Sequence, residues 1–241
     1  MPAPAHVTIG GVTYPASVAD ELSAGSVIFC AGVDQTTLAH DLELAERVDF
    51  PTVHMFDPSP ASERVITQVR ALLDRHPGEI AEYPPWNQIA KLRVPSASLL
   101  HHKLSLTAAA GASSVPASPT PSRSLTLAAA TQRLGCGGVD LLRLYGGVEV
   151  CEMLETMLEK CEGGGSDPGS TPLPRSSILP LPRSSIMPLP RYLVLFWRPV
   201  PSSSTYATRR QRIVDVLHAI GYRAAGGETS ERADRTCWRR E

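Results

Sequence analysis

The sequence has little of several features that would assign a protein to a class at once. Lysine and arginine number 23 against 24 aspartates and glutamates, so the net charge of −1 offers no positive surface to nucleic acid or an anionic membrane. The apolar run Tyr192–Trp197 is far shorter than the roughly 20 residues that span a bilayer. The first residues lack the basic and apolar segments of a secretory signal. We therefore expect a soluble protein, cytoplasmic by default, with no nucleic-acid or membrane partner.

Cysteines are also too few and too scattered for a disulfide framework or a zinc site. The five cysteines include no Cys-x-x-Cys pair, and no histidines follow them at zinc-ligand spacing. His101 and His102 are adjacent, and neighbours on a helix or strand do not face one site. The sequence predicts reduced thiols and no metal site.

No G-x-G-x-x-G motif occurs, but residues 26–34 have the outline of a nucleotide-cofactor turn. The apolar run Ser-Val-Ile-Phe-Cys predicts a strand that leads to Gly32. A glycine has no Cβ, so backbone N–H groups around it can approach a ligand closely. Asp34 stands where a second glycine would fall. A helix should follow, because Leu38, Leu42 and Ala45 recur at helical spacing.

A second apolar run, residues 53–56, places Asp57 at the end of the next predicted strand. Asp57 follows Gly32 by roughly 25 positions, and an acid about 20 residues beyond such a turn binds a ribose hydroxyl in dinucleotide folds. An alternative remains open at this point. Gly32 can be an ordinary turn residue, and Asp57 can cap the helix that follows it.

The run AGVDQTTLAHDLELAERVDFPTVHMFDPSP resembles the opening of the FkbM-type methyltransferases, and Phe-Asp-Pro-Ser-Pro at residues 56–60 is its most specific part. The resemblance implies one domain over residues 1–241, with the α/β, Rossmann-like doubly wound sheet of class I SAM-dependent methyltransferases. It also implies S-adenosylmethionine (SAM) as cofactor, with Gly32 beside its amino-acid end and Asp57 on its ribose. The cofactor-binding residues that it implies are Ala31, Gly32, Asp34, Asp57 and Pro58.

A second stretch, SLTLAAATQRLGCGGVDLLRLYGGVEVCEML, is similar to a later part of the same family. Without a gap, Tyr145 stands at the family's strand-end aspartate. A shift by one residue pairs Glu149 with the family's last glutamate but leaves that aspartate unmatched, and both registers remain open. A phenol is a poor base at neutral pH, so Glu149 is the only candidate catalytic residue, and we expect methyl transfer to be weak or absent.

Other segments predict further helices and strands around this outline. Ser59 and Pro60 are typical of a helix start. The predicted helices are 60–75, 125–134, one carrying Met153 and Leu154, and one around 213–220; the predicted strands are 139–144, 191–197, one from Tyr222 and one at 236–238.

Three functions are compatible with these patterns. The first is O-methyl transfer from SAM to a small-molecule or glycan-like acceptor, in which the enzyme mainly positions the acceptor. The second is a degenerate homologue that binds SAM or a partner without catalysis. The third is a proline-rich adaptor, suggested by the repeat TPLPRSSILPLPRSSIMPLPR. No unit of this repeat forms P-x-x-P, so it favours a disordered Gly/Pro-rich insertion over residues 163–190, or unspliced sequence in the gene model.

Overall fold

A mixed β-sheet of seven strands forms the centre of the structure. The structure is a computed structural model, and it describes residues 5–74, 89, 91–107, 124–147, 150–155, 157, 189–198, 204–225 and 234–241. The strands are β3 (Val27–Ala31), β4 (Thr52–Phe56), β5 (Leu99–His102), β8 (Leu141–Gly146), β9 (Tyr192–Trp197), β10 (Tyr222–Ala224) and β11 (Arg235–Arg240). The first five of these run parallel, and β11 is antiparallel to both of its neighbours, β9 and β10.

The order of strands across the sheet is β5-β4-β3-β8-β9-β11-β10. The chain moves outward from β3 through β4 to β5 and then returns to place β8 on the other side of β3. The strand order therefore reverses between β3 and β8. In open α/β sheets, ligands bind outside the carboxyl ends of the strands at such a reversal. This edge of the sheet is the place to look for a site.

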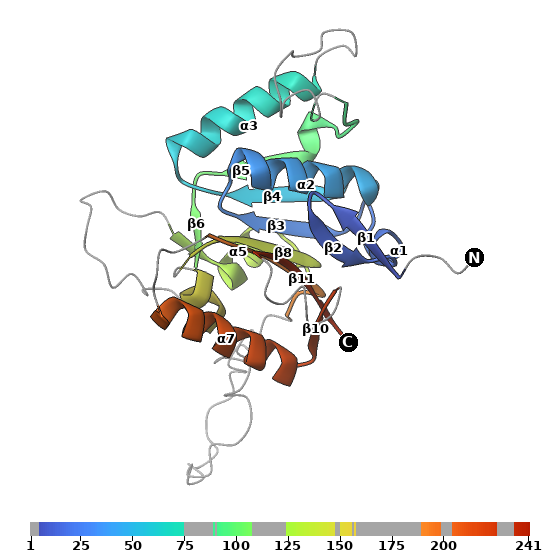
Figure 1. Ribbon diagram of the computed structural model, residues 1–241. Coiled ribbons are helices and arrows are strands. Elements are labelled where there is room, and N and C mark those ends of the chain that lie inside the picture. The colour runs from blue at the N-terminus through green and yellow to red at the C-terminus, as the bar shows by residue number, and fades with distance from the viewer. Residues whose placement is uncertain are drawn as a thin grey trace, which may run out of the picture.

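Helices cover both faces of the sheet. Helices α2 (Gln35–Arg47) and α3 (Pro60–Leu73) lie on one face, and α5 (Leu127–Arg133) and α7 (Ser204–Ala219) lie on the other (Figure 1). One hydrophobic cluster lies under α2 and α3, and a second lies under α5 and α7. The structure thus has the mixed α/β architecture, with a mostly parallel sheet between helices, that the alternation of predicted elements indicates.

Strand β9 illustrates how the sequence produces these two cores. Its side chains are all buried, with Tyr192, Val194 and Phe196 in the cluster under α2 and α3. The alternate residues, from Leu193 to Trp197, belong to the opposite cluster. A strand covered on both faces has no polar side, which explains the continuous apolar run.

Most predicted elements agree with the structure to within two residues at each end, but α7 begins at Ser204, nine residues before the helix predicted around 213–220. Helix α3 begins as expected, because the Ser59 hydroxyl accepts a hydrogen bond from the N–H of Ser62 at 3.2 Å and Pro60 occupies the first turn. It ends at Leu73, two residues before the predicted end. Residues 163–188, which are nearly all of the predicted insertion, lie outside the described residues, as does Glu149.

The sequence patterns do not predict β5 of the central sheet or several short elements, among them a hairpin at the amino-terminal end of the chain. A hairpin turn places Gly10 between two distant elements: its N–H donates to Glu43 of α2 at 2.9 Å, and its carbonyl accepts from Arg235 of β11 at 3.2 Å. The hairpin thereby joins the first helix layer to the last strand. The remaining short elements are β1 (His6–Ile9), β2 (Val12–Pro15), α1 (Val18–Glu21), η1 (Ser96–Ser98), β6 (Ser105–Thr107) and β7 (Ser124–Thr126).

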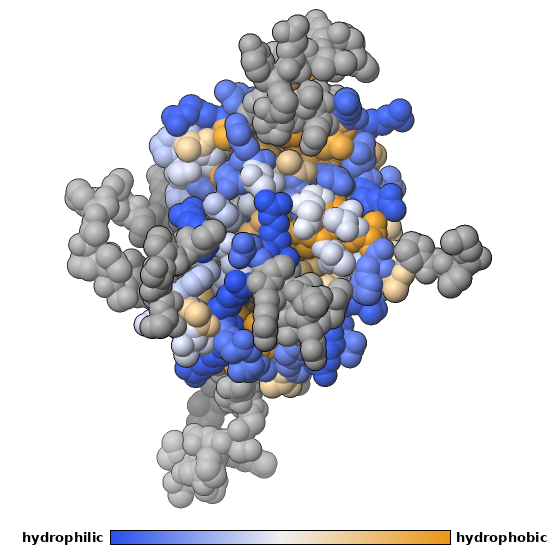
Figure 2. All heavy atoms as spheres, in the orientation of Figure 1, coloured by the Kyte–Doolittle hydropathy of each residue, from blue (hydrophilic) through white to orange (hydrophobic). Residues whose placement is uncertain are grey.

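The described surface is largely polar. On the face in Figure 2, hydrophilic residues predominate, and hydrophobic residues reach the surface in small separate areas. Among the described residues, Leu100 is the large hydrophobic residue that is exposed to solvent, with 38% of its surface accessible. No helix within the described ranges combines the length and the apolar composition needed to cross a bilayer.

Candidate functional site at the carboxyl edge of the sheet

The turn after β3 is built around Gly32. Its φ angle of +76° lies in the left-handed region, which side chains with a Cβ rarely adopt. A Cβ at this position would lie 2.9 Å from the carbonyl oxygen of Tyr145 and 3.2 Å from its ring. The Gly32 N–H donates to the carbonyl of Phe56 at 3.0 Å. The close approach that requires glycine here is therefore that of β8, and the N–H joins β3 to the end of β4.

Asp57 ties this turn to the one after β4. One carboxylate oxygen accepts a hydrogen bond from the Val33 N–H at 2.9 Å, and the other accepts from the Ser59 N–H at 2.8 Å. Each carboxylate oxygen can accept more than one hydrogen bond, so each keeps acceptor capacity for a ligand. The cap of α3 is Ser59, whereas Asp57 bridges two turns. Pro58, which follows, is exposed.

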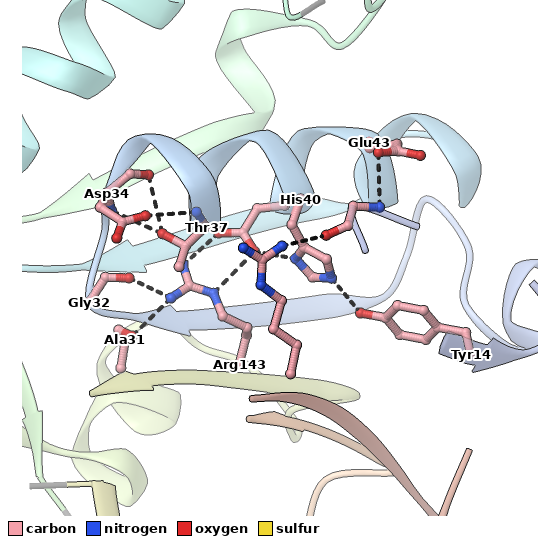
Figure 3. Close-up of polar contacts among 11 residues, drawn as sticks. Tyr14, Ala31, Gly32, Asp34, Thr37, His40, Glu43 and Arg143 are labelled. Atoms are coloured by element: carbon pink, nitrogen blue, oxygen red, sulfur yellow. Dashed lines mark hydrogen bonds and ion pairs between the residues drawn. The ribbon is translucent and has the colours of Figure 1, made fainter. Parts of the chain in front are cut away.

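Asp34 caps helix α2. Its carboxylate accepts from the Thr37 N–H at 2.8 Å, and its own N–H donates to the Thr37 hydroxyl at 2.9 Å (Figure 3). This reciprocal pair satisfies backbone donors at the start of the helix. The structure thus brings all five predicted cofactor residues together at the ends of β3 and β4, but it uses the Asp34 side chain to start a helix.

A buried arginine holds the glycine turn from below. Arg143 lies in the middle of β8 with no solvent exposure, and it donates to the carbonyl of Ala31 at 3.0 Å and to that of Gly32 (Figure 3). Its guanidinium also forms a bidentate ion pair with Asp41 of α2, at 2.6 and 3.1 Å. Two parallel N–H···O bonds to a carboxylate are the strong form of this interaction. Arg143 therefore fixes both the turn and the helix that follows it.

The ion pair extends into a buried polar chain. His40 contacts Asp41 at 3.0 Å through Nδ1, and its Nε2 lies 2.7 Å from the Tyr14 hydroxyl of the amino-terminal hairpin (Figure 3). Burial raises the pKa of Asp41, but the Arg143 charge and the His40 hydrogen bond lower it by more, to about 2. Burial also raises the pKa of Tyr14, with a further contribution from the Asp41 charge. Asp41 is therefore ionised and Tyr14 neutral at physiological pH.

The sequence contains a signal for this network, but the spacing of apolar residues alone does not reveal it. Arg143 interrupts the apolar run Leu-Leu-Arg-Leu, and Asp41 lies on the apolar stripe of its helix between Leu38 and Leu42. Charged residues are almost never fully buried unless paired. A positive charge in a predicted buried strand and a negative charge on a predicted buried helix face therefore indicate an ion pair between the two.

At the strand-order reversal itself, the described residues present an aromatic and a cation. The Arg198 guanidinium lies 5.1 Å from the centre of the Tyr145 ring, within the range of a cation–π contact. Tyr145 also lies close to Gly32. Among the described residues that end β8 and β9, none is a carboxylate or a histidine. The described residues here offer an aromatic ring and a cation, and none of them is an evident general base.

Histidines gather at the neighbouring end of β5. His101 donates through Nε2 to the Asp57 carbonyl at 3.0 Å, and His102 Nε2 lies 3.1 Å from Nδ1 of His54. Burial and the proximity of His102 lower the pKa of His54 to about 4. Burial, His101 and Arg133 lower the pKa of His102. Both rings of the His54–His102 pair are thus neutral at pH 7, and one donates a hydrogen bond to the other.

Comparisons with known proteins add no assignment to this geometry. No protein-family model, curated protein or solved structure matches the chain. Within the described residues, no three histidine, cysteine, aspartate or glutamate side chains are grouped as metal ligands. Function must therefore be inferred from the strand order and from the residues at the carboxyl edge of the sheet.

Proposed function

We propose that this protein binds SAM in the manner of a class I methyltransferase and that its methyl-transfer activity is weak or absent. The observation that carries the proposal is the position of Asp57, which follows the second parallel strand and accepts a hydrogen bond from the glycine turn after the first, at 2.9 Å from Val33 N. An acid at this place beside a glycine turn is what ribose recognition needs.

The strand order supports the same proposal. The first five positions, β5-β4-β3-β8-β9, follow the order of a Rossmann-like sheet, in which strand 1 lies between strands 2 and 4. The resemblance of residues 56–60 to the FkbM-type family points to the same cofactor.

In this proposal, the Asp57 carboxylate accepts hydrogen bonds from the ribose hydroxyls with its remaining acceptor capacity, and Ala31, Gly32 and Pro58 lie beside the cofactor. Bound SAM would supply an electrophilic methyl group. The chain would have to position an acceptor oxygen and remove its proton, which general-base catalysis accelerates by about 10²- to 10⁴-fold. Tyr145 and Arg198 provide no carboxylate for that task, so binding without efficient transfer is the better-supported function.

Calorimetric titration with SAM tests the cofactor assignment. Asp57→Ala should weaken SAM binding by roughly 1–3 kcal/mol, the range for a hydrogen bond to a charged group. Asp74→Ala removes an exposed carboxylate at the other end of α3 and should leave the affinity unchanged. Thermal unfolding of each variant, measured in parallel, separates a loosened turn from a lost ligand contact. No heat with SAM, or equal affinities for Asp57→Ala and the native chain, would contradict the proposal.

Turnover of labelled SAM with a panel of hydroxylated acceptors tests the second half of the proposal. The native chain should transfer little or no label, and Tyr145→Asp should increase transfer if a strand-end acid is the missing group. Glu149, outside the described residues, is the alternative base. Efficient transfer by the native chain that Glu149→Gln abolishes would establish an active O-methyltransferase instead.

A further inference from the structure

A pocket of about 540 Å³ lies beside the candidate cofactor site, at the carboxyl ends of β4 and β5 and against α5. Its polar lining residues are His101, His102, Lys103, Ser124 and Arg133, and its apolar lining residues are Phe56 and three leucines. None of the predicted cofactor residues lines it. Its volume is in the range of small-molecule sites, which are about 300–1,000 Å³.

The pair of adjacent histidines corrects an expectation from the sequence. Neighbouring residues inside a strand point to opposite faces, so His101 and His102 were not expected to share a site. They instead stand at the end of β5, and both residues line the pocket. Lys103 follows directly after them.

The described residues that line the pocket include two cations, Lys103 and Arg133, and no carboxylate. Lys103 pairs with Glu63 outside the pocket at 2.6 Å, and both side chains are about half exposed or more, at 61% and 48%. Exposed pairs of this kind contribute little to stability, so a phosphate can compete with Glu63 for the ammonium. Arg133 lies in the last turn of α5, is exposed, and is close enough to His102 to act on its charge state. The described lining therefore includes two cations, of which Lys103 is also paired with Glu63, and two imidazoles whose Nε2 atoms have partners within the protein.

We propose that this pocket binds a phosphate monoester with a compact apolar body, with the phosphate against Arg133, Lys103 and Ser124. A monoester phosphate carries a charge of about −1.5 to −2 at pH 7, which matches two cations better than a single carboxylate does. The guanidinium fork suits phosphate oxygens, and a serine hydroxyl can donate to a third oxygen. Phe56 and the leucine side chains would contact the apolar body. The assignment uses residues different from those proposed to hold SAM.

Fluorescence titration of the full chain with 1-naphthyl phosphate, and with 1-naphthol as its uncharged counterpart, tests the pocket. The phosphate should bind about tenfold more tightly or better, and added salt should weaken its binding. Arg133→Gln should reduce the affinity for naphthyl phosphate by about tenfold. Arg64→Gln makes the same charge change on the exposed face of α3, outside the pocket, and should leave the affinity unchanged.

Equal affinities for naphthyl phosphate and naphthol, or an affinity that Arg133→Gln does not change, would overturn the proposal. The titration is repeated with saturating SAM. Unchanged affinity supports a separate pocket, whereas displacement of the probe by SAM would place both ligands in one site and overturn the assignment. If SAM itself fails to bind, the Arg133 result still stands, so the two proposals fail independently.

Discussion

Replacing Arg143 by methionine should destabilise the protein far more than a surface arginine substitution. Arg143 has no solvent exposure and contacts Asp41 at 2.6 and 3.1 Å. The Arg143→Met variant leaves a buried carboxylate without its cation. It also removes the donor that serves the carbonyls of Ala31 and Gly32. Breaking a buried pair by removing one partner costs about 3–5 kcal/mol, a large part of the ~5–15 kcal/mol that stabilises a typical domain.

The pKa of Asp41 gives a second, lower value for the free energy that the partners of the Asp41 carboxylate contribute. Its fall from 3.8 to about 2 in the folded protein corresponds to roughly 2 kcal/mol of preference for the charged form. That figure concerns only the charge of Asp41, and burial opposes it. Arg143→Met also leaves two carbonyl groups without a donor, so we expect the larger loss. The contribution of the Asp41 charge is present above pH 3.8 and is lost as the pH falls toward 2.

Urea unfolding measures this loss directly, with Arg64→Met on the exposed face of α3 as the matched control. The control should change the free energy of unfolding by no more than about 0.5 kcal/mol. A double variant, Arg143→Met with Asp41→Leu, should be less destabilised than Arg143→Met alone, because no unpaired charge remains in the core. A loss below about 1 kcal/mol for Arg143→Met, or additive effects in the double variant, would refute the buried-pair argument.

Two further predictions concern the turn and the histidine pair. Gly32→Ala should lower the free energy of unfolding by about 1–3 kcal/mol or more, because it combines a left-handed φ with a contact of 2.9 Å to the Tyr145 carbonyl. Gly135→Ala is the control, since at φ +66° with open space around its Cβ it has only the conformational cost. Equal losses in urea unfolding for the two variants would exclude the Tyr145 contact as a cause. Because the pKa of His54 is lowered from 6.5 to about 4, its neutral form stabilises the fold fully above pH 6.5, and the free energy of unfolding should fall by up to about 1.4 kcal/mol per pH unit as the pH drops toward 4. His54→Leu should fall less steeply over the same range, and parallel curves would show that His54 does not carry this dependence.

The sequence by itself predicted β3, β4, β8 and β9 of the central sheet and helices α3 and α5 to within two residues, but not β5 or the first nine residues of α7. Helix α3 follows from the Ser59 cap, the proline after it and an apolar stripe, all of which act within a few residues. Strand β9 follows from an apolar run of a length suited to a buried strand. The sequence also placed Gly32 and Asp57 at the ends of neighbouring strands, because alternating strands and helices predict a parallel sheet.

Only the tertiary structure decided which of these residues meet and what their side chains do. Arg143 and Asp41 are 102 positions apart, and a charge in an apolar run does not name its partner. Asp57 and Asp34 both suited a ligand by sequence, yet the fold gives Asp57 two backbone donors and makes Asp34 a helix cap. Caps and periodicity depend on neighbours along the chain, whereas these contacts depend on strand order and register, which bring together backbone and charge from distant segments.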